Sequence, residues 1–323
     1  MLADNWREMT SQSMRAGFGD GLVEAGRINE RVVAVSADLS ESTQVSKFAE
    51  EFEERFIEVG VAEQNLVTVA SGLAHAGRKP FAASYAVFSP GRNWEQIRTT
   101  ICLNDQPVVI VGSHAGLNVG PDGATHQMLE DIALMRSLPN MAEFAPADYS
   151  EARQLTLALV DYDHPAYDRL AREKVASIFN DQPFEIGKAK VLREGGDVAL
   201  LGTGTMTHTL LVVADRLAGR GIQAEVVHFP TIKPLDEEAV LAVASKCGRV
   251  VTAEEAQVAA GFGGAVSEVL SENLPMPIKR IGVNDRFGQS GQAAELIDHY
   301  GLSADRVLGQ IVNFIDVMPQ YHR

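Results

Sequence analysis

The sequence predicts an α/β protein of two doubly wound domains, each with a mainly parallel sheet between helices. Its 323 residues exceed one average domain and suffice for two with separate cores. The 28 glycines and the runs of valine, alanine and leucine are typical of parallel strands buried on both faces. Apolar runs of strand length also alternate with helical patterns of about ten residues, which indicates βαβ units.

In the first half of the chain this alternation begins with an amphipathic helix. We expect, in order, a helix over 13–26, strands over 32–35 and 56–60, a helix over 62–76, a strand over 81–85, a helix over 93–103 and a strand over 107–112. Apolar residues at helical spacing define the helix over 62–76, and Gly77 stands where a C-terminal glycine ends such a helix.

The pattern restarts after a stretch without periodicity, Lys174 to Gly187. We place the domain boundary there, between residues 1–180 and 181–323. Consecutive strands linked by helices predict a second, mainly parallel sheet. We expect its strands over 198–201, 224–229, 249–252 and 278–281 and its helices over 208–218, 236–245 and 262–273.

The composition excludes several classes of partner. A formal net charge of −15 argues against nucleic acid and anionic membranes, because both require clustered lysine and arginine. The two cysteines, Cys102 and Cys247, lie far apart in apolar surroundings, without a disulfide framework or metal-type spacing. The N-terminus is polar and lacks a signal-peptide core, and no stretch is long enough to span a bilayer. We therefore expect a cytoplasmic location.

Three features of the second half have ordinary structural explanations. The run Gly202-Thr203-Gly204-Thr205 lacks the third glycine of a dinucleotide fingerprint, and a tight strand-to-helix turn accounts for it. We expect Glu254 and Glu255 at a solvated strand end, and His228 in the packing of a strand. The second domain thus offers no catalytic constellation.

Two runs in the first half contain candidate functional residues. Glu63 lies between a strand and an apolar helix, where a first-turn glutamate also favours the helix dipole. The run Gly120 through Gln127 follows a buried strand, with His114 upstream. Its Asp122 and His126 could serve a zinc site, but no HExxH, no cysteine pair and no obvious further ligands accompany them. A polar cluster that binds hydroxyl groups fits better.

Taken together, segments of the first half resemble the pyrimidine-binding half of transketolases and of the related 1-deoxyxylulose-5-phosphate synthases. Their order and spacing match, and the resemblance extends over nearly the whole chain. It implies a thiamine diphosphate pyrimidine-binding domain followed by a transketolase C-terminal-like domain. The matching segments are Ser36-Ala37-Asp38-Leu39, Ala62-Glu63-Gln64, Tyr85 through Phe88, Gly120 through Gln127, Arg136-Ser137-Leu138-Pro139-Asn140 and Pro146-Ala147-Asp148.

The resemblance implies specific roles toward the cofactor. Glu63 falls on the glutamate that hydrogen-bonds the pyrimidine ring and activates it, while the cofactor supplies the electron sink. Phe88 and Tyr85 match aromatic positions that pack on this ring, and Trp94 matches less closely because the segment after Phe88 is one residue longer than in the synthases. Asp38 falls on an aspartate near the cofactor and the subunit interface. Core packing for the aromatics and a strand-ending turn for Asp38 are the alternatives.

The resemblance also implies a substrate site for a sugar with an anionic group. Asp122 and His126 fall on contacts to the hydroxyl groups of the donor, and His126 is also a candidate catalytic residue. Guanidinium groups suit phosphate geometry, although the anion could also be a sulfonate. A solvated helix arginine is the alternative for Arg15. The positions that match phosphate contacts are His114, Arg15, Ser42 and Arg172.

A complete transketolase is about twice as long and begins with a diphosphate-binding domain whose Gly-Asp-Gly motif holds Mg²⁺. In this chain Gly19-Asp20-Gly21 lies within the expected first helix, and no asparagine follows at the motif's spacing, so we interpret it as a coincidence. Because the chain starts within a few residues of the pyrimidine domain, we expect a split gene. A separate N-terminal subunit would then carry the true motif, with two copies of each subunit in an α2β2 assembly, and this chain alone would be inactive and bind the cofactor weakly.

The expected activity is transfer of a two-carbon ketol unit between sugars, by default sugar phosphates as in pentose phosphate metabolism. One alternative is the β subunit of a 2-oxoacid dehydrogenase E1 component, which is similar in length and architecture. Three features favour transketolase over it: the run Asp122 through Gln127, the turn Ser36-Ala37-Asp38-Leu39 and Arg172. A split 1-deoxyxylulose-5-phosphate synthase is a second alternative, against which Arg15 and Ser42 weigh mildly, and a non-catalytic scaffold is a third.

Overall fold

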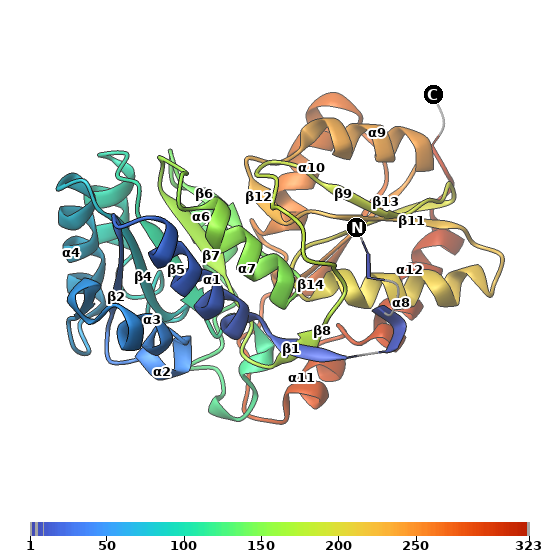
Figure 1. Ribbon diagram of the computed structural model, residues 1–323. Helices are drawn as coiled ribbons and strands as arrows, with labels where there is room; N and C mark the ends of the chain where they lie inside the picture. Colours follow the sequence, from blue (N-terminus) through green and yellow to red (C-terminus); the bar gives the residue numbers. More distant parts are fainter. Residues whose placement is uncertain (1, 4–5, 9, 322–323) are drawn as a thin grey trace.

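The computed structural model describes residues 2–3, 6–8 and 10–321, which form two α/β domains that lie side by side (Figure 1). A seven-stranded sheet lies in the first domain with strand order β12-β6-β7-β5-β4-β2-β3, and a five-stranded sheet lies in the second with order β14-β13-β10-β11-β9. A two-stranded ribbon of β1 and β8 completes the sheets. The predicted α/β architecture with mainly parallel sheets is confirmed.

Parallel pairing dominates the first sheet, and most of its central strands are wholly buried, as the apolar runs predicted. Its strands are β2 (Val32–Ser36), β3 (Phe56–Glu58), β4 (Lys79–Tyr85), β5 (Val109–Ser113), β6 (Ala142–Phe144) and β7 (Ala166–Arg169). The helical segments around it are α1 (Met14–Ile28), α2 (Ser40–Thr43), α3 (Ser46–Glu51), the 3₁₀ turn η2 (Glu53–Arg55), α4 (Glu63–His75), α5 (Trp94–Gln96) with the π-helical turn η3 (Ile97–Cys102), the 3₁₀ segment η4 (Leu117–Asp122), α6 (Asp131–Arg136) and α7 (Tyr149–Ala158).

Helices α1 and α7 cross at close range on one face of this sheet (Figure 1). A Cβ atom on Gly17 would lie 2.3 Å from the carbonyl oxygen of Tyr149, and one on Gly21 would lie 2.8 Å from that of Arg153. Between these glycines the carboxylate of Asp20 accepts hydrogen bonds from Lys47 and Tyr149, each at 2.7 Å. The Gly-Asp-Gly run is therefore a helix-packing feature, as the interpretation of coincidence requires.

The second domain repeats the layered arrangement around strands β9 (Lys190–Arg193), β10 (Val198–Gly202), β11 (Ala224–His228), β13 (Val250–Gln257) and β14 (Ile278–Val283). All pairs in this sheet are parallel except β11 with β9. Its helices are α8 (Met206–Ala218), α9 (Glu237–Cys247), α10 (Phe262–Asn273), α11 (Ala293–His299) and α12 (Ala304–Val317). Gly202-Thr203-Gly204-Thr205 forms the expected turn from β10 into α8.

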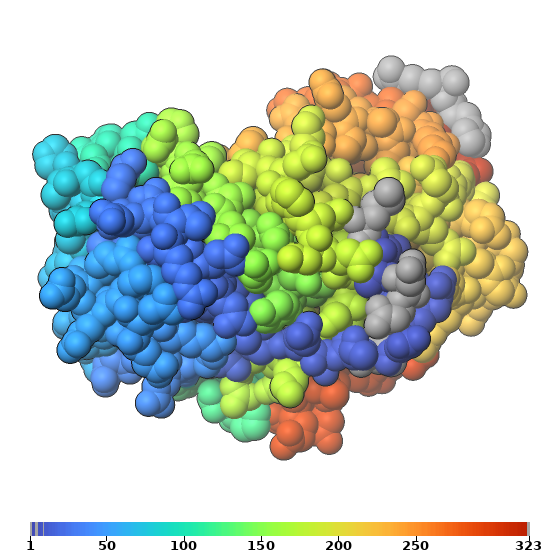
Figure 2. Space-filling view, viewed as in Figure 1, coloured from blue at the N-terminus to red at the C-terminus, as the bar shows by residue number. Residues whose placement is uncertain are grey.

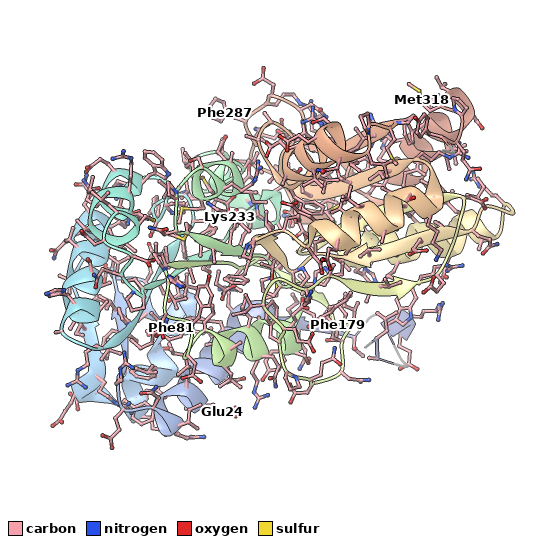
Figure 3. The ribbon with its side chains drawn as sticks, turned by 90° about the horizontal axis from the view of Figure 1, so that it is seen from above. Glu24, Phe81, Phe179, Lys233, Phe287 and Met318 are labelled. Carbon is pink, nitrogen blue, oxygen red and sulfur yellow. The ribbon has the colours of Figure 1, made fainter. Side chains whose placement is uncertain are left out.

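Two segments cross from one domain to the other, which the sequence did not reveal. Strand β12 (Thr231–Lys233) leaves the second domain and pairs antiparallel with β6, and Lys233 lies between the domains in Figure 3. At the N-terminus, the short turn η1 (Trp6–Glu8) buries Trp6 in the core of the second domain. Strand β1 (Ser11–Ser13) then pairs with β8 (Lys174–Ala176), so that the N-terminal segment runs along both domains (Figure 2).

Buried polar contacts also join the domains. Glu151 of α7 accepts hydrogen bonds at 2.7 Å from both Lys190 and His228, and His228 is fully buried as expected. The expectation of a solvated strand end at Glu254 and Glu255 was wrong, because both side chains are at least 96% buried where β13 meets the first domain. In the part of the chain that the structure describes, no helix has the length and apolar character to cross a membrane.

Candidate functional site

The candidate site lies at the carboxyl ends of the parallel strands of the first sheet. Glu63 follows β3, Tyr85 ends β4, His114 follows β5, and Arg172 comes three residues after β7. Because parallel strands direct their carboxyl ends to one edge, residues far apart in the sequence meet there, at the usual position of ligand sites in such folds. The sequence prediction of which residues matter thus coincides with one edge of one sheet.

Glu63 is the first residue of α4 and is 98% buried, which is unusual for a carboxylate. Its Oε2 atom lies 2.6 Å from Nη1 of Arg92, a half-exposed side chain, and its backbone carbonyl accepts a 2.7 Å hydrogen bond from Nδ2 of Asn93. Glu63 and Arg92 line a cavity of about 530 Å³, together with Gln64 and Gln96. The carboxylate is therefore shielded, held by Arg92 and adjacent to open space, while Asn93 holds the backbone of the same residue.

An aromatic cluster connects the aromatic candidates to both histidines. The ring of Tyr85 stacks on His114 with 3.7 Å between centroids and lies 5.9 Å from Phe88 in a parallel orientation. His126 meets Phe88 edge-on at 5.6 Å. The guanidinium of Arg92 lies 4.9 Å from the centroid of the Phe88 ring and so links this cluster to Glu63.

Trp94 lies apart from this cluster in its contacts. Its Nε1 atom donates a 3.0 Å hydrogen bond to the carbonyl of Leu134, and its ring packs on the hydrophobic core between the sheet and α4. These contacts match the core-packing alternative for this residue.

Arg15 brings the predicted anion-binding residues together. Its Nη1 and Nη2 atoms donate hydrogen bonds of 2.6 and 2.7 Å to the backbone carbonyls of Ser42 and Arg172. Its Nε atom is buried without a partner, which leaves a donor free for a ligand. The alternative of a solvated helix arginine does not hold for Arg15, since the side chain is engaged on two sides.

His114 is neutral at physiological pH. Burial and the positive charges of Arg15 and Arg172 lower its pKa to about 3, and its Nδ1 atom lies 2.7 Å from the hydroxyl of Ser113. The positive charge of this region thus comes from the guanidinium groups of Arg15 and Arg172, the second of which is paired with Glu173 at 2.5 Å. His114 and Asp38 have positive φ angles of 57° and 59°, backbone conformations that are rare for such residues and gather at functional sites.

Asp38 and Asp122 are exposed at the rim of the sheet edge. The backbone N–H of Asp38 donates to Glu58 Oε1 at 2.8 Å, in the turn that follows β2. Asp122 ends η4, and the chain then folds back so that the N–H of His126 donates to the carbonyl of Gly123 at 2.9 Å. Within the described residues, no group of three or more histidine, cysteine, aspartate or glutamate side chains is arranged to hold a metal ion.

Sequence reasoning missed three polar residues of the site. Arg92 and Asn93 contact Glu63. The only trace of them in the sequence was an Arg-Asn pair that begins four residues after Phe88. Asn118 binds the backbone of Arg172 through its Oδ1 atom at 2.7 Å. An asparagine in a glycine-rich turn carries no distinctive signal in one sequence.

Comparison with protein families defines the class to which this fold and site belong. The model described as transketolase, pyrimidine binding domain matches residues 10–177, and the one described as transketolase, C-terminal domain matches residues 187–307. The chain therefore belongs to the transketolase family, and it is a transferase component that corresponds to the C-terminal section of these enzymes.

Individual relatives narrow this assignment. The chain is 43% identical to a transketolase C-terminal section from Methanocaldococcus jannaschii, over 93% of this chain and 96% of that protein. It is 40% identical to the 6-deoxy-6-sulfo-D-fructose transketolase subunit SqwH of a Clostridium strain, over 91% and 92% of the two chains. A solved structure described as a split gene transketolase, inactive beta4 tetramer, superposes with a TM-score of 0.89 at 43% identity and covers 95% of this chain and 99% of its own.

Proposed function

We propose that this chain is the C-terminal subunit of a thiamine diphosphate-dependent transketolase, which transfers a two-carbon ketol unit from a ketose donor to an aldose acceptor. The observation that carries the proposal is the buried carboxylate of Glu63 at the start of α4, which borders a cavity of about 530 Å³. A shielded, fixed carboxylate is what proton sharing with a ring nitrogen requires.

The residues at this edge fit the pyrimidine half of the cofactor. In this proposal Glu63 holds the proton shared with the ring, Phe88 and Tyr85 provide apolar surface for it, and Asp38 lies at the rim. The carbonyl oxygen of the Asn93 side chain is buried without a partner, an acceptor that a bound group with N–H donors would satisfy. When bound, thiamine diphosphate supplies the electron sink for cleavage of the carbon–carbon bond. The diphosphate and Mg²⁺ would be held by a partner subunit.

The substrate side of the proposal follows from charge and geometry. Arg15 and Arg172 would bind the anionic end of the sugar, with neutral His114 as a hydrogen-bonding partner and Ser42 close by. Asp122 and His126 would contact hydroxyl groups of the donor, and His126 would also accept the proton that a donor hydroxyl loses as the carbon–carbon bond breaks. The sugar phosphates of pentose phosphate metabolism are the default substrates, and a sulfonated sugar such as that in the name of the Clostridium relative is the alternative.

The proposed active assembly pairs two copies of this chain with two copies of an N-terminal subunit in the cytoplasm. Two buried free cysteines fit that compartment. The solved relative with 43% identity carries the description of an inactive tetramer of one subunit type, which supports the expectation that this chain alone lacks activity.

A reconstitution experiment tests the proposal. Ketol transfer is assayed in three samples: this chain alone, this chain with a transketolase N-terminal subunit from the same genome, and the Glu63→Ala variant of this chain with the same N-terminal subunit. We expect activity only when the wild-type chain and the N-terminal subunit are both present. Donors that carry a phosphate and donors that carry a sulfonate are compared in parallel. Turnover by the chain alone would refute the split-subunit proposal, and full activity of Glu63→Ala would refute the role of Glu63.

A further inference from the structure

The buried side-chain amide of Asn118 joins the segment of the first domain that contains Arg172 to the second domain. Asn118 is 93% buried, and its Oδ1 atom accepts hydrogen bonds from the backbone N–H groups of Arg172 at 2.7 Å and Glu173 at 3.2 Å. Its Nδ2 atom donates at 3.0 Å to the carbonyl of Ala115 and to Oε1 of Glu255. Both donors and both acceptor positions of the amide are therefore in use, which fixes its orientation.

Glu255 reaches this amide from β13 of the second domain. Its Oε1 atom also accepts the backbone N–H of Asn118 at 2.8 Å, and its Oε2 atom accepts the hydroxyl of Thr205 at 2.7 Å. Gly116 has a φ of +90°, and a Cβ atom there would lie 2.4 Å from Oε1, so the carboxylate sits directly beneath the start of η4. Three hydrogen bonds compensate the burial of the charge.

The second domain also contacts the far end of the loop that runs from Asn118 to Gln127. The Nε2 atom of Gln127 donates hydrogen bonds to the carbonyls of Gly120 at 3.1 Å and Gln289 at 3.0 Å. Gln289 belongs to the loop between β14 and α11, whose exposed Phe287 stands at the edge of the molecule in Figure 3. The stretch that carries Asp122 and His126 is thus attached to the second domain at both ends.

We propose that Glu255 is a positioning residue: through Asn118 it fixes both the Arg172 backbone and the loop that carries Asp122 and His126. The inference rests on the proposed function, because the anion-binding role of Arg172 belongs to it. Glu255 itself acts at a distance, since both of its carboxylate oxygens are occupied by protein donors. The second domain thereby controls how tightly the anionic end of the substrate is bound.

Two substitutions separate this role from general stability. Glu255→Ala removes all three hydrogen bonds, whereas Glu255→Gln keeps an oxygen for Asn118 and places an NH₂ group beside the hydroxyl of Thr205. Lys190→Met serves as the matched control, because it breaks a different contact between the domains, the 2.7 Å bond to Glu151, away from the anion site.

The first measurement is hydrogen exchange by mass spectrometry on the chain alone, which requires no activity. Glu255→Ala should accelerate amide exchange in peptides over 115–127 and 170–176 at least tenfold, the effect of about 1.4 kcal/mol on local opening. Glu255→Gln and Lys190→Met should leave exchange in these peptides as in the wild type. Unchanged exchange in Glu255→Ala, or equal acceleration in Lys190→Met, would overturn the proposal.

The second measurement uses the complex reconstituted with the N-terminal subunit and D-fructose 6-phosphate as donor, with inorganic phosphate as competitor. Glu255→Ala should raise the KM of the donor and the inhibition constant of phosphate by about tenfold and lower kcat by a smaller factor, because the loop that carries His126 is loosened as well, with cofactor affinity near wild type. A fall in kcat with unchanged KM would contradict the positioning role. If the wild-type complex itself shows no ketol transfer, the proposed function fails, and the exchange data still decide whether Glu255 fixes the loop.

Discussion

Replacing Arg92 with glutamine should lower the free energy of unfolding of the chain by about 1–2 kcal/mol at pH 7. The guanidinium lies 2.6 Å from Glu63, whose side chain is 2% exposed, whereas that of Arg92 is 51% exposed. Breaking a buried pair costs about 3–5 kcal/mol and breaking an exposed pair about 0–1 kcal/mol. A pair with one member buried and the other half in solvent belongs between these limits.

A double-mutant cycle isolates the interaction. Urea unfolding is followed by tryptophan fluorescence for the wild type, Glu63→Gln, Arg92→Gln and the double variant, and we expect a coupling free energy of about 1–2 kcal/mol. Arg27→Gln is the control, because Arg27 pairs with Glu51 at the same 2.6 Å distance but on the surface, and its midpoint should match the wild type. Coupling below about 0.3 kcal/mol would refute the claim that Arg92 stabilises the buried carboxylate.

Three further predictions concern packing, acid stability and thiol reactivity. Gly17→Ala should cost about 1–3 kcal/mol in urea unfolding because its Cβ meets backbone at 2.3 Å, whereas Gly72→Ala, with open space around it, should be neutral or stabilising. Burial favours a raised pKa for Glu151, but His228 and a lysine outweigh it and lower the pKa from 4.5 to about 2. This carboxylate thus contributes stability above pH 4.5 that is lost as pH falls toward 2, and His228→Gln should flatten the loss in urea titrations between these pH values. Burial raises the pKa of both cysteine thiols to about 12, so iodoacetamide at pH 8 should label them only after unfolding, and rapid labelling of the native chain would contradict their burial.

Much of the fold was predictable because parallel strands leave a local signature. The continuous apolar runs predicted the buried strands β2, β5 and β10, and helical spacing predicted α10 at its observed bounds. The position of Glu63 between a strand and a helix also predicted that it would lie in the first turn of that helix. These features depend on neighbours in sequence, and so they appear in one chain.

Features that depend on the other domain were not predictable in this way. Glu254 and Glu255 are adjacent acidic residues of β13, which in isolation indicate solvent, yet both are buried. Glu255 contacts Asn118 of the first domain, and Glu254 lies against the start of α10 in its own domain. The backbone groups of residues 262–263 hydrogen-bond Glu254, whose pKa burial raises to about 7. The crossing of β12 depends likewise on an edge offered by β6, about ninety residues earlier in the chain. Pairing over such separations leaves no local pattern.

The surface beside Glu63 bears on the proposed partner subunit. Val61 is 71% exposed and lines the same cavity as the almost fully buried Glu63. We expect the partner subunit to bury this valine in the assembled complex. Val61→Asp should therefore abolish assembly with the N-terminal subunit in size-exclusion chromatography while the chain keeps its circular dichroism spectrum. Val191→Asp is the matched control, since Val191 is 50% exposed on β9 of the other domain, and it should assemble normally. Normal assembly of Val61→Asp would show that the partner does not cover this part of the site, and the diphosphate-binding half would then have to approach Glu63 from another side.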